Sequence, residues 1–221
     1  VFILIGSDGM PKMAYSEEER ERIRIQLITV GLDLMAKQGI QHTTVEQIYK
    51  SVGISRTFFY SFFPTKEDLI VETLYFQQPK IIHYVHELMG DPSLNWRSAV
   101  KKFLFSCCYG ERNGIAILTI EEQQLLFKRL SSESYDIFRK KQQLLFKSIL
   151  EGFGIQAEKT NINLFINLSL ALMVVRKAIP NQLPLFVPEA ADETVAFQID
   201  VLVNALEKLK AKYPLAKDKN K

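Results

Sequence analysis

The segment Thr44–Phe63 constrains the fold of this chain most, because two short helix patterns lie on either side of Gly53. Thr44 and Ser55 are residue types that cap helix N termini, so a helix is predicted after each of them. Helices this short are not stable alone in water and need a neighbour to pack on. The pattern is typical of a helix-turn-helix, whose second helix can enter the major groove of DNA. The two predicted helices cover residues 45–51 and 56–62, and their shared core would contain Val45, Ile48, Val52, Ile54 and Phe59.

Longer helices are predicted before and after this segment. Ser16 and Glu19 form a capping box that opens a helix, and Gly39 is the expected C-terminal stop of that helix. This first helix supplies the surface on which the two short helices can pack. A fourth helix is predicted after Thr65, and it either stops before Pro79 or continues beyond it through a kink.

Helical patterns also dominate the rest of the chain, and no stretch shows the sustained alternation of a strand. The predicted fold class is therefore all-α, with an N-terminal three-helix helix-turn-helix domain and a C-terminal helical domain. The apolar start of the chain is too short for a signal peptide, so residues 1–15 are expected to be a tag or a disordered N terminus, with Met10 or Met13 as the natural start. The remaining predicted parts are the helix-turn-helix domain 16–63, a helical domain 64–212 whose first helix is the connector, a basic tail 213–221, and helices over 94–109, 115–129, 132–153, 158–178 and 189–212.

Charge alone does not identify a partner for this protein. The formal net charge is +3, which is too small to argue for nucleic acid. Residues 10–78 contain eight basic and nine acidic side chains, so no bulk basic surface marks the helix-turn-helix region. DNA binding would therefore depend on where individual side chains lie.

The patterns of the common enzyme classes are not found in the sequence. It contains no glycine-rich phosphate loop, nucleophile elbow or HExxH, so we predict no catalytic residue, no enzymatic activity and no cofactor. His83, His86 and Glu87 could share a helix face and hold a metal, but such a set is more often solvated, and we predict no metal. Two rival classes stay open, namely a helical protein-interaction module that does not bind DNA and an unrecognised enzyme.

Cysteine usage and hydropathy indicate the compartment. Cys107 and Cys108 are adjacent and lack the spacing of a zinc site, which fits a reducing cytoplasm. No segment is apolar for long enough to span a membrane, so no membrane partner is predicted. The expected location is therefore cytoplasmic.

The DNA-binding signature of the TetR family is similar to the stretch GIQHTTVEQIYKSVGISRTFFYSFFPTKEDL of this chain. The chain departs from the family pattern at Thr57-Phe58, where Gly-Thr is frequent, and near Ser61-Phe62, where a basic residue or histidine is frequent. The resemblance implies a ligand-responsive transcriptional repressor that binds a pseudo-palindromic operator as a homodimer and is released by a small hydrophobic effector. The residues that carry it are Gly39, Thr43, Thr44, Val45, Gly53, Ile54, Ser55, Tyr60, Phe63, Pro64, Lys66, Glu67 and Leu69.

The residues expected to contact DNA combine this resemblance with their own chemistry. Arg56 and Thr57 open the second short helix and can reach base edges, and arginine pairs most readily with guanine. Phe58 can touch thymine methyl groups or point inward. Hydroxyl and amine groups nearby can contact phosphates. The predicted DNA-binding residues are Thr43, Thr44, Ser55, Arg56, Thr57, Phe58, Tyr60, Ser61 and Lys66.

Two long helices near the C terminus are apolar nearly all round, so both sides of each helix must be covered. The resemblance implies that they form a four-helix bundle with the same helices of a second subunit. The alternative is that they form the buried core of a monomer. The predicted dimer interface contains Leu164, Leu168, Leu172, Ile199, Leu202 and Leu206.

Aromatic residues are frequent between the fourth helix and this apolar pair. The resemblance implies that the region encloses an effector pocket, and an apolar pocket with a few polar groups suits a hydrophobic ligand. The alternative is ordinary core packing. The predicted pocket residues are Trp96, Phe103, Tyr109, Phe127 and Tyr135.

Overall fold

A computed structural model describes residues 15–109, 120–179 and 187–215 of the chain. Within these ranges the protein is all-α, as predicted, and contains no strand longer than a single bridge. The helices are α1 (Glu17–Gln38), α2 (Val45–Val52), α3 (Arg56–Tyr60), α4 (Lys66–Phe76), α5 (Gln78–Gly90), α6 (Trp96–Tyr109), α7 (Ile120–Arg129), α8 (Ser132–Gly152), α9 (Ile162–Ala178) and α10 (Ala191–Lys212), with short 3₁₀ turns η1 (Ala157–Lys159) and η2 (Pro188–Ala190).

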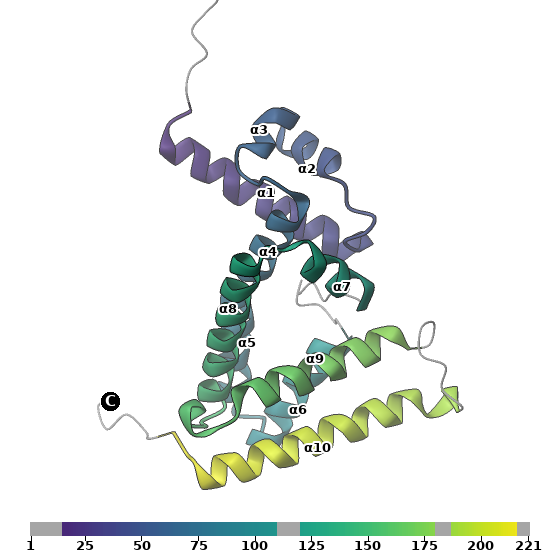
Figure 1. Ribbon diagram of the computed structural model, residues 1–221. Coiled ribbons are helices and arrows are strands. Elements are labelled where there is room, and N and C mark those ends of the chain that lie inside the picture. The colour runs from purple at the N-terminus through teal and green to yellow at the C-terminus, as the bar shows by residue number, and fades with distance from the viewer. Residues whose placement is uncertain (1–14, 110–119, 180–186, 216–221) are drawn as a thin grey trace, which may run out of the picture.

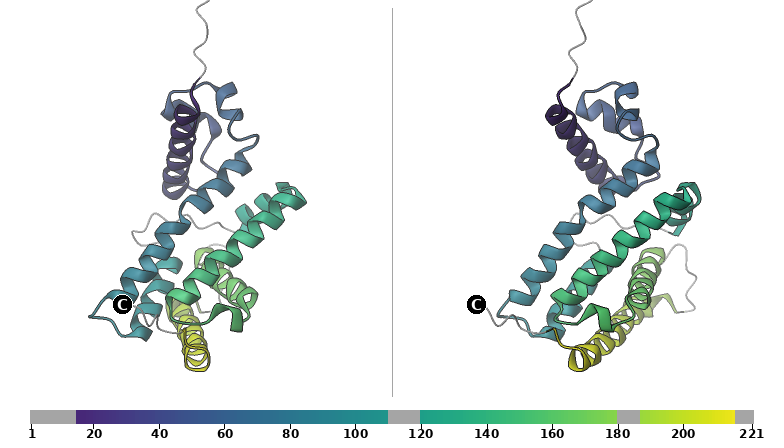
Figure 2. Two further views of the ribbon diagram at one scale, coloured as in Figure 1. Left: turned by 90° about the vertical axis from the view of Figure 1, so that its left-hand side faces the viewer. Right: turned by 60° about the vertical axis from the view of Figure 1, so that its left-hand side comes forward.

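Figure 1 shows the arrangement of these helices in space. Helices α1, α2 and α3 form a small unit at one end, and α4 leads from it toward the rest of the molecule. Helices α5 and α8 run side by side below α4, and both views of Figure 2 show the same pairing. Helices α9 and α10 lie at the opposite end of the molecule from α3. The N-terminal and C-terminal helical parts expected from the sequence are therefore both present.

The N-terminal unit is held together by one apolar core that α4 shares. Leu27, Ile48, Phe59 and Leu69 are fully buried and come from α1, α2, α3 and α4 respectively. Helix α1 begins with the predicted capping box, because the Ser16 hydroxyl accepts from a first-turn N–H and the Glu19 carboxylate accepts from the Ser16 N–H. Because one core joins the four helices, the short helices α2 and α3 gain the packing partners that their length requires.

The junction of α4 and α5 resolves the alternatives left open at Pro79. The two helices are separated only by Gln77, which keeps helical backbone angles of φ −82° and ψ −14°. The chain therefore continues through a kink. Pro79 occupies the first turn of α5, where its missing N–H would have no helical partner in any case.

The C-terminal part has its own core, built by α5, α6, α8, α9 and α10. Fully buried members include Val85, Val100, Val195 and Ile199. Close approach of α8 to α5 depends on Gly152, because a Cβ atom there would lie 2.7 Å from a Val85 methyl carbon. Two separate cores explain why the chain divides into an N-terminal and a C-terminal part.

Several helix boundaries differ from the sequence-based prediction for local reasons. Helix α3 ends at Tyr60, two residues early, because the N–H groups of Ser61 and Phe62 bond to carbonyls three residues back. Helix α9 begins after Asn161, whose side chain caps it, and the residues expected at its start form η1 instead. The first residues of the helix predicted over 115–129 lie outside the described ranges.

The start of the predicted basic tail belongs to the fold. The Gln156 N–H donates to the Tyr213 carbonyl at 2.9 Å, and the Leu215 N–H donates to the Gly154 carbonyl at 2.8 Å. Residues 213–215, the first part of the segment assigned to the basic tail, therefore pair with the loop after α8. The rest of that tail and nearly all of the expected N-terminal tag, residues 1–14, lie outside the described residues. Among the helices that are described, none is long and apolar enough to cross a membrane.

Candidate functional site

Helices α2 and α3 are held in a fixed geometry by two caps and one glycine turn. The Thr44 hydroxyl accepts from the Gln47 N–H at 3.1 Å, and the Gln47 side chain accepts from the Thr44 N–H at 2.8 Å. Gly53 has φ 77° and ψ 27°, a left-handed conformation that favours glycine, and it turns the chain toward α3. The Ser55 hydroxyl caps α3, and Phe59 is fully buried beneath it. This is the helix-turn-helix that the sequence predicts.

One face of α3 is open to solvent and chemically suited to a polar partner. Arg56, Thr57, Tyr60 and Ser61 are exposed there, as is the cap residue Ser55. The Arg56 guanidinium lies 5.8 Å from the centre of the Tyr60 ring and forms no ion pair with any residue in the described ranges. Its N–H donors are therefore available to an external acceptor. Thr44 is also exposed, at the N terminus of α2.

Phe58 faces the start of α1, which favours the inward orientation of the two considered from sequence. Its ring stacks on Tyr15 with centroids 4.7 Å apart and meets Phe62 edge-on at 5.0 Å. The Arg20 guanidinium lies over both phenylalanine rings, 5.5 Å from Phe58 and 4.7 Å from Phe62. Phe58 therefore links α3 to α1. Arg20 adds a positive charge beside α3 that sequence reasoning missed, because its partners are far away in the chain.

Two of the predicted DNA contacts have side chains that donate to backbone carbonyls within the N-terminal unit. Thr43 has no exposed surface, and its hydroxyl donates to the Gly39 carbonyl at 2.8 Å. The Lys66 amine donates to the Ile40 carbonyl at 2.6 Å, and burial lowers the pKa of that amine. These placements correct the expectation that Thr43 and Lys66 contact DNA, because the polar atoms of both side chains already have internal partners.

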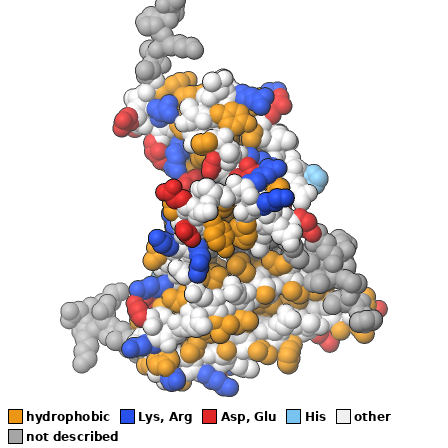
Figure 3. Space-filling view, in the orientation of Figure 1, with side chains coloured by type: hydrophobic (Ala, Val, Ile, Leu, Met, Phe, Trp, Pro, Cys, Tyr) orange, Lys and Arg blue, Asp and Glu red, His pale blue; other side chains and the backbone are white. Residues whose placement is uncertain are grey.

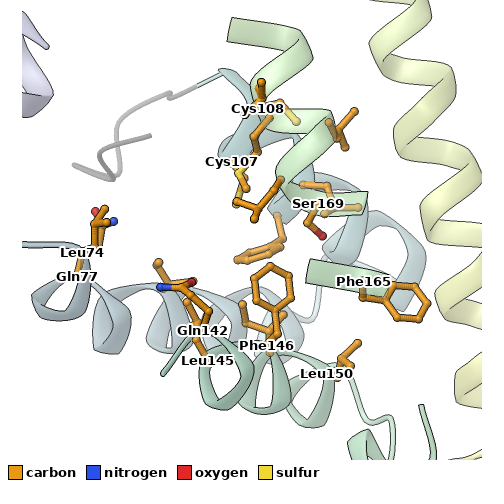
Figure 4. Close-up of a pocket in the computed structure, with 18 of the residues that line it drawn as sticks. Leu74, Gln77, Cys107, Cys108, Gln142, Leu145, Phe146, Leu150, Phe165 and Ser169 are labelled. Atoms are coloured by element: carbon orange, nitrogen blue, oxygen red, sulfur yellow. The ribbon is translucent and has the colours of Figure 1, made fainter. Parts of the chain in front are cut away.

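A largely apolar cavity of about 160 Å³ lies in the C-terminal part, bordered by helices α4 to α9 and by Leu206 of α10. Gln142 and Phe146 of α8 border the same space as Ser169 of α9 (Figure 4). No lining residue within the described ranges carries a charge. The lining residues are Leu74, Gln77, Ile81, Phe103, Leu104, Cys107, Cys108, Gln123, Phe127, Phe138, Gln142, Leu145, Phe146, Ile149, Leu150, Phe153, Phe165, Ser169, Leu170, Leu172, Met173, Val174 and Leu206.

Two of the five predicted pocket residues, Phe103 and Phe127, line this cavity. The other three do not, which corrects the prediction. Trp96 is not a lining residue, and its indole N–H donates to the Phe153 carbonyl at 2.8 Å. The Tyr109 hydroxyl donates to Asp192 at 3.0 Å, and Tyr135 is exposed with its ring against Phe127. Aromatic content indicated the region, but no local pattern marks which side chains converge on one space.

Burial makes the two adjacent cysteines part of the apolar wall. It raises the pKa of the Cys107 thiol to about 12 and that of the Cys108 thiol to about 11. Both thiols therefore stay protonated at neutral pH, and the reactive thiolate form is suppressed. In this state each cysteine behaves as a small hydrophobic residue.

An exposed apolar surface lies on α9 and α10, at the end of the molecule shown in the lower half of Figure 3. Leu164 and Leu168 of α9 are 48% and 43% exposed, and Phe197 and Val201 of α10 are 69% and 51% exposed. The other four predicted interface residues, Leu172, Ile199, Leu202 and Leu206, are buried within the protomer. This corrects the assignment of those four, because helical periodicity alone did not separate the inner face of each helix from the outer one. We call Leu164, Leu168, Phe197 and Val201 the outer apolar face.

The histidines of α5 form no evident metal site. His83 lies 3.5 Å from Glu87 on the exposed surface of the helix, and His86 is exposed as well. No group of three or more potential metal ligands occurs among the residues with described positions.

The fold and the site together define a class of protein, namely a helix-turn-helix DNA-binding protein with a helical C-terminal domain that contains a cavity. Residues 27–73 match the family model of bacterial regulatory proteins, tetR family. This N-terminal segment is therefore similar to the DNA-binding domain of TetR-family regulators. No curated protein matches the sequence.

Solved structures support the fold over most of the chain. A TetR transcriptional regulator from Legionella pneumophila is 19% identical with a TM-score of 0.50, and the match covers 86% of this chain and 98% of that one. The reduced form of E. coli NemR is 15% identical with a TM-score of 0.50, covering 85% and 96%. The repressor AlkX from a Dietzia strain is 16% identical with a TM-score of 0.50, covering 84% and 96%. At these identities the similarity establishes the fold alone.

Proposed function

We propose that this protein is a ligand-responsive repressor that binds a pseudo-palindromic operator as a homodimer. The observation that carries the proposal is the exposed N-terminal face of α3, where Arg56 and Thr57 are accessible and Arg56 has no ion-pair partner among the described residues. A recognition helix presents its N-terminal residues to base edges in the major groove. The buried Phe59 beneath this face and the caps at Thr44 and Ser55 hold it rigid, which favours specific recognition.

The homodimer is supported by the outer apolar face. Four large hydrophobic side chains, on two helices that contact each other, are exposed without cover from the described protomer. Such a patch marks an interaction surface in a soluble protein. Two copies joined there would present two recognition helices to one DNA duplex, and half-sites of such dimers lie about 34–36 Å apart.

The operator proposal is tested by selecting binding sites from a random double-stranded library with the full chain. We expect enriched sequences with an inverted repeat, whose binding weakens as salt rises. Enriched sequences without symmetry would contradict the dimeric mode of binding. No enrichment over repeated rounds would contradict sequence-specific DNA binding and would favour a protein-interaction module.

The effector, we propose, is an uncharged lipophilic molecule with a hydrogen-bonding group. The described wall of the cavity offers no charge to pair with a charged ligand, and burying an unpaired charge is costly. The Gln142 amide borders the cavity and has no hydrogen-bond partner among the described residues. An amide can both donate and accept, so it suits a hydroxyl, ketone or amide group on the ligand.

The effector class is tested with three probes that share one ring system and differ in charge, namely naphthalenemethanol, naphthoate and naphthylmethylamine. By calorimetry we expect the neutral alcohol to bind at least about tenfold more tightly than either charged probe. Gln142→Leu should weaken the binding of the alcohol but not the binding of unsubstituted naphthalene. Gln143→Leu is the matched control, because Gln143 donates to Asn163 at 2.8 Å instead of bordering the cavity. Tighter binding of a charged probe would contradict the proposed class.

A further inference from the structure

Helix α7 contacts the N-terminal unit through one of its faces. Glu122, Leu126 and Arg129 are spaced four and three residues apart, so they share that face. The buried Glu122 carboxylate accepts a hydrogen bond from the Ile40 N–H at 2.9 Å. Leu126 is 2% exposed and belongs to the core shared by α1 to α4. Arg129 forms an ion pair with Glu67 in the first turn of α4. Thus one short helix of the C-terminal part is joined to the N-terminal unit by polar and apolar contacts.

The contact of Glu122 falls on a loop that leads directly into the helix-turn-helix. Ile40 lies between the end of α1 and Thr44, the cap of α2. Its N–H is held by Glu122, and its carbonyl accepts from the Lys66 amine at 2.6 Å. We call these two hydrogen bonds the Ile40 clamp. The clamp fixes both the N–H and the carbonyl of Ile40. A movement of α7 would therefore change the path of the backbone that leads into α2.

The neighbouring face of α7 borders the cavity. Gln123 and Phe127 each follow a residue of the first face, which rotates them by about 100° around the helix axis. Both line the cavity. The Phe127 ring also lies 5.8 Å from that of Phe138, a second lining residue that packs against the N-terminal core. A ligand that displaces these side chains therefore acts on the same rigid helix that holds Ile40.

From this arrangement we infer that α7 couples the cavity to the DNA-binding surface, with Glu122 as the residue that transmits its displacement to Ile40. The inference rests on the proposed function and specifies how the cavity regulates DNA binding. The protein would exist in two states, one with the Ile40 clamp formed and one with it broken. A ligand changes the balance between these states only if it binds one of them more tightly than the other. This route does not pass through the kink at Gln77, because α7 contacts the loop before α2 directly.

The first test measures the coupling between probe and operator. The operator affinity is measured with and without saturating naphthalenemethanol, the probe, for the wild type, Glu122→Gln and Glu133→Gln. The affinity of each protein for the probe alone is measured separately. Glu133→Gln is the matched control, because it removes the same charge from the exposed first turn of α8. We expect the probe to weaken operator binding of the wild type and control by roughly 5-fold to 150-fold, the usual range of allosteric coupling. For Glu122→Gln this factor should be smaller than in the wild type, because a neutral amide oxygen accepts from the Ile40 N–H more weakly than a carboxylate, while the probe affinity changes little.

Equal coupling in Glu122→Gln and the wild type would overturn the role of α7. If the wild type binds neither operator nor probe in the separate titrations, the proposed function fails, and the second test then decides the inference about α7 by itself.

The second test needs no operator and no ligand. Phe127→Ala perturbs the cavity face of α7, and hydrogen exchange of the amides from Gly39 to Thr44 reports on the clamp. We expect these amides to exchange at least about tenfold faster than in Leu125→Ala, which truncates an exposed side chain of the same helix. Gln123→Ala provides a second cavity-face variant if Phe127→Ala loses helical structure by circular dichroism. Exchange in both cavity-face variants equal to that in Leu125→Ala would show that the two faces are not linked and would overturn the inference.

Discussion

The Lys66 amine donates a hydrogen bond to the backbone carbonyl of Ile40, 2.6 Å away, and so joins the first turn of α4 to the loop before α2. Sequence reasoning assigned this lysine to a DNA phosphate, because a positive charge at a helix start beside a helix-turn-helix suits that role. The structure gives the amine an internal acceptor and partial burial instead. The difference changes what a substitution at this position should do.

Lys66→Met should lower the free energy of unfolding by about 1–3 kcal/mol, because it removes a hydrogen bond donated by a charged group. Urea denaturation measures this change. The salt dependence of operator binding should stay the same. A salt slope reduced by about one without loss of stability would instead show that Lys66 contacts a phosphate.

Arg56→Ala should weaken binding to the selected operator by about 1–3 kcal/mol and relax base preference at one position of each half-site. The reason is that Arg56 is exposed at the start of α3 and forms no ion pair with the residues whose positions are described. Titrations with the operator and with single-base variants measure both effects. Arg22→Ala removes an equal charge from the exposed surface of α1 and should not change base preference. Unchanged discrimination in Arg56→Ala would exclude a base contact by this residue.

Charged substitutions on the outer apolar face and in the protomer core should have different effects on assembly and folding. Phe197→Glu should give a folded monomer that binds operator weakly, because Phe197 is 69% exposed in the protomer. Leu202→Glu should prevent folding, because it places a carboxylate in the core without a partner. Sedimentation equilibrium and circular dichroism distinguish the two results. A folded, fully dimeric Phe197→Glu protein would place the dimer interface elsewhere.

The cavity thiols should react slowly in the native protein at neutral pH. Burial raises the pKa of Cys107 to about 12, so little thiolate is present, and a thiol reagent should label the protein much faster in urea. The control is the Cys107→Ala/Cys108→Ala double variant, which should show no labelling. Rapid native labelling at both positions would contradict a protonated, enclosed pair.

The raised pKa of Cys107 also predicts how the stability of the protein responds to alkaline pH. An unfolded thiol loses its proton near pH 9, whereas folded Cys107 keeps it to about pH 12, so the folded state binds more protons in that range. The stability contributed by this site is therefore complete below pH 9 and is lost as pH rises toward 12. Burial also raises the pKa of Tyr75 from 10.0 to about 12, so this residue adds to the loss of stability at alkaline pH. Cys107→Ala should flatten the decline measured by urea denaturation between pH 8 and pH 11, and a decline as steep as that of the wild type would contradict this account.

The helix-turn-helix could be predicted from sequence because its determinants are local. The cap at Thr44, the glycine turn at Gly53 and the cap at Ser55 each act within one helical turn, and the structure contains all three. Burial of Ile48 and Phe59 follows from helical periodicity within the same segment. The all-α class and the positions of the long helices were predicted for the same reason, whereas the choice between a stop and a kink near Pro79 was left open by the sequence.

The tertiary structure decided which of the predicted side chains are accessible. Thr43 and Thr44 are neighbours of the same type, yet only Thr44 reaches solvent, because the Thr43 hydroxyl meets the Gly39 carbonyl. Leu168 and Leu202 look alike in sequence, but the contacts of α9 and α10 with α6 and α8 bury one and expose the other. The cavity and the Ile40 clamp depend on residues from several helices, such as Glu122 and Ile40, which are 82 positions apart. Periodicity and capping indicate where a helix lies along the chain, but contacts between residues this distant form only when the helices pack together.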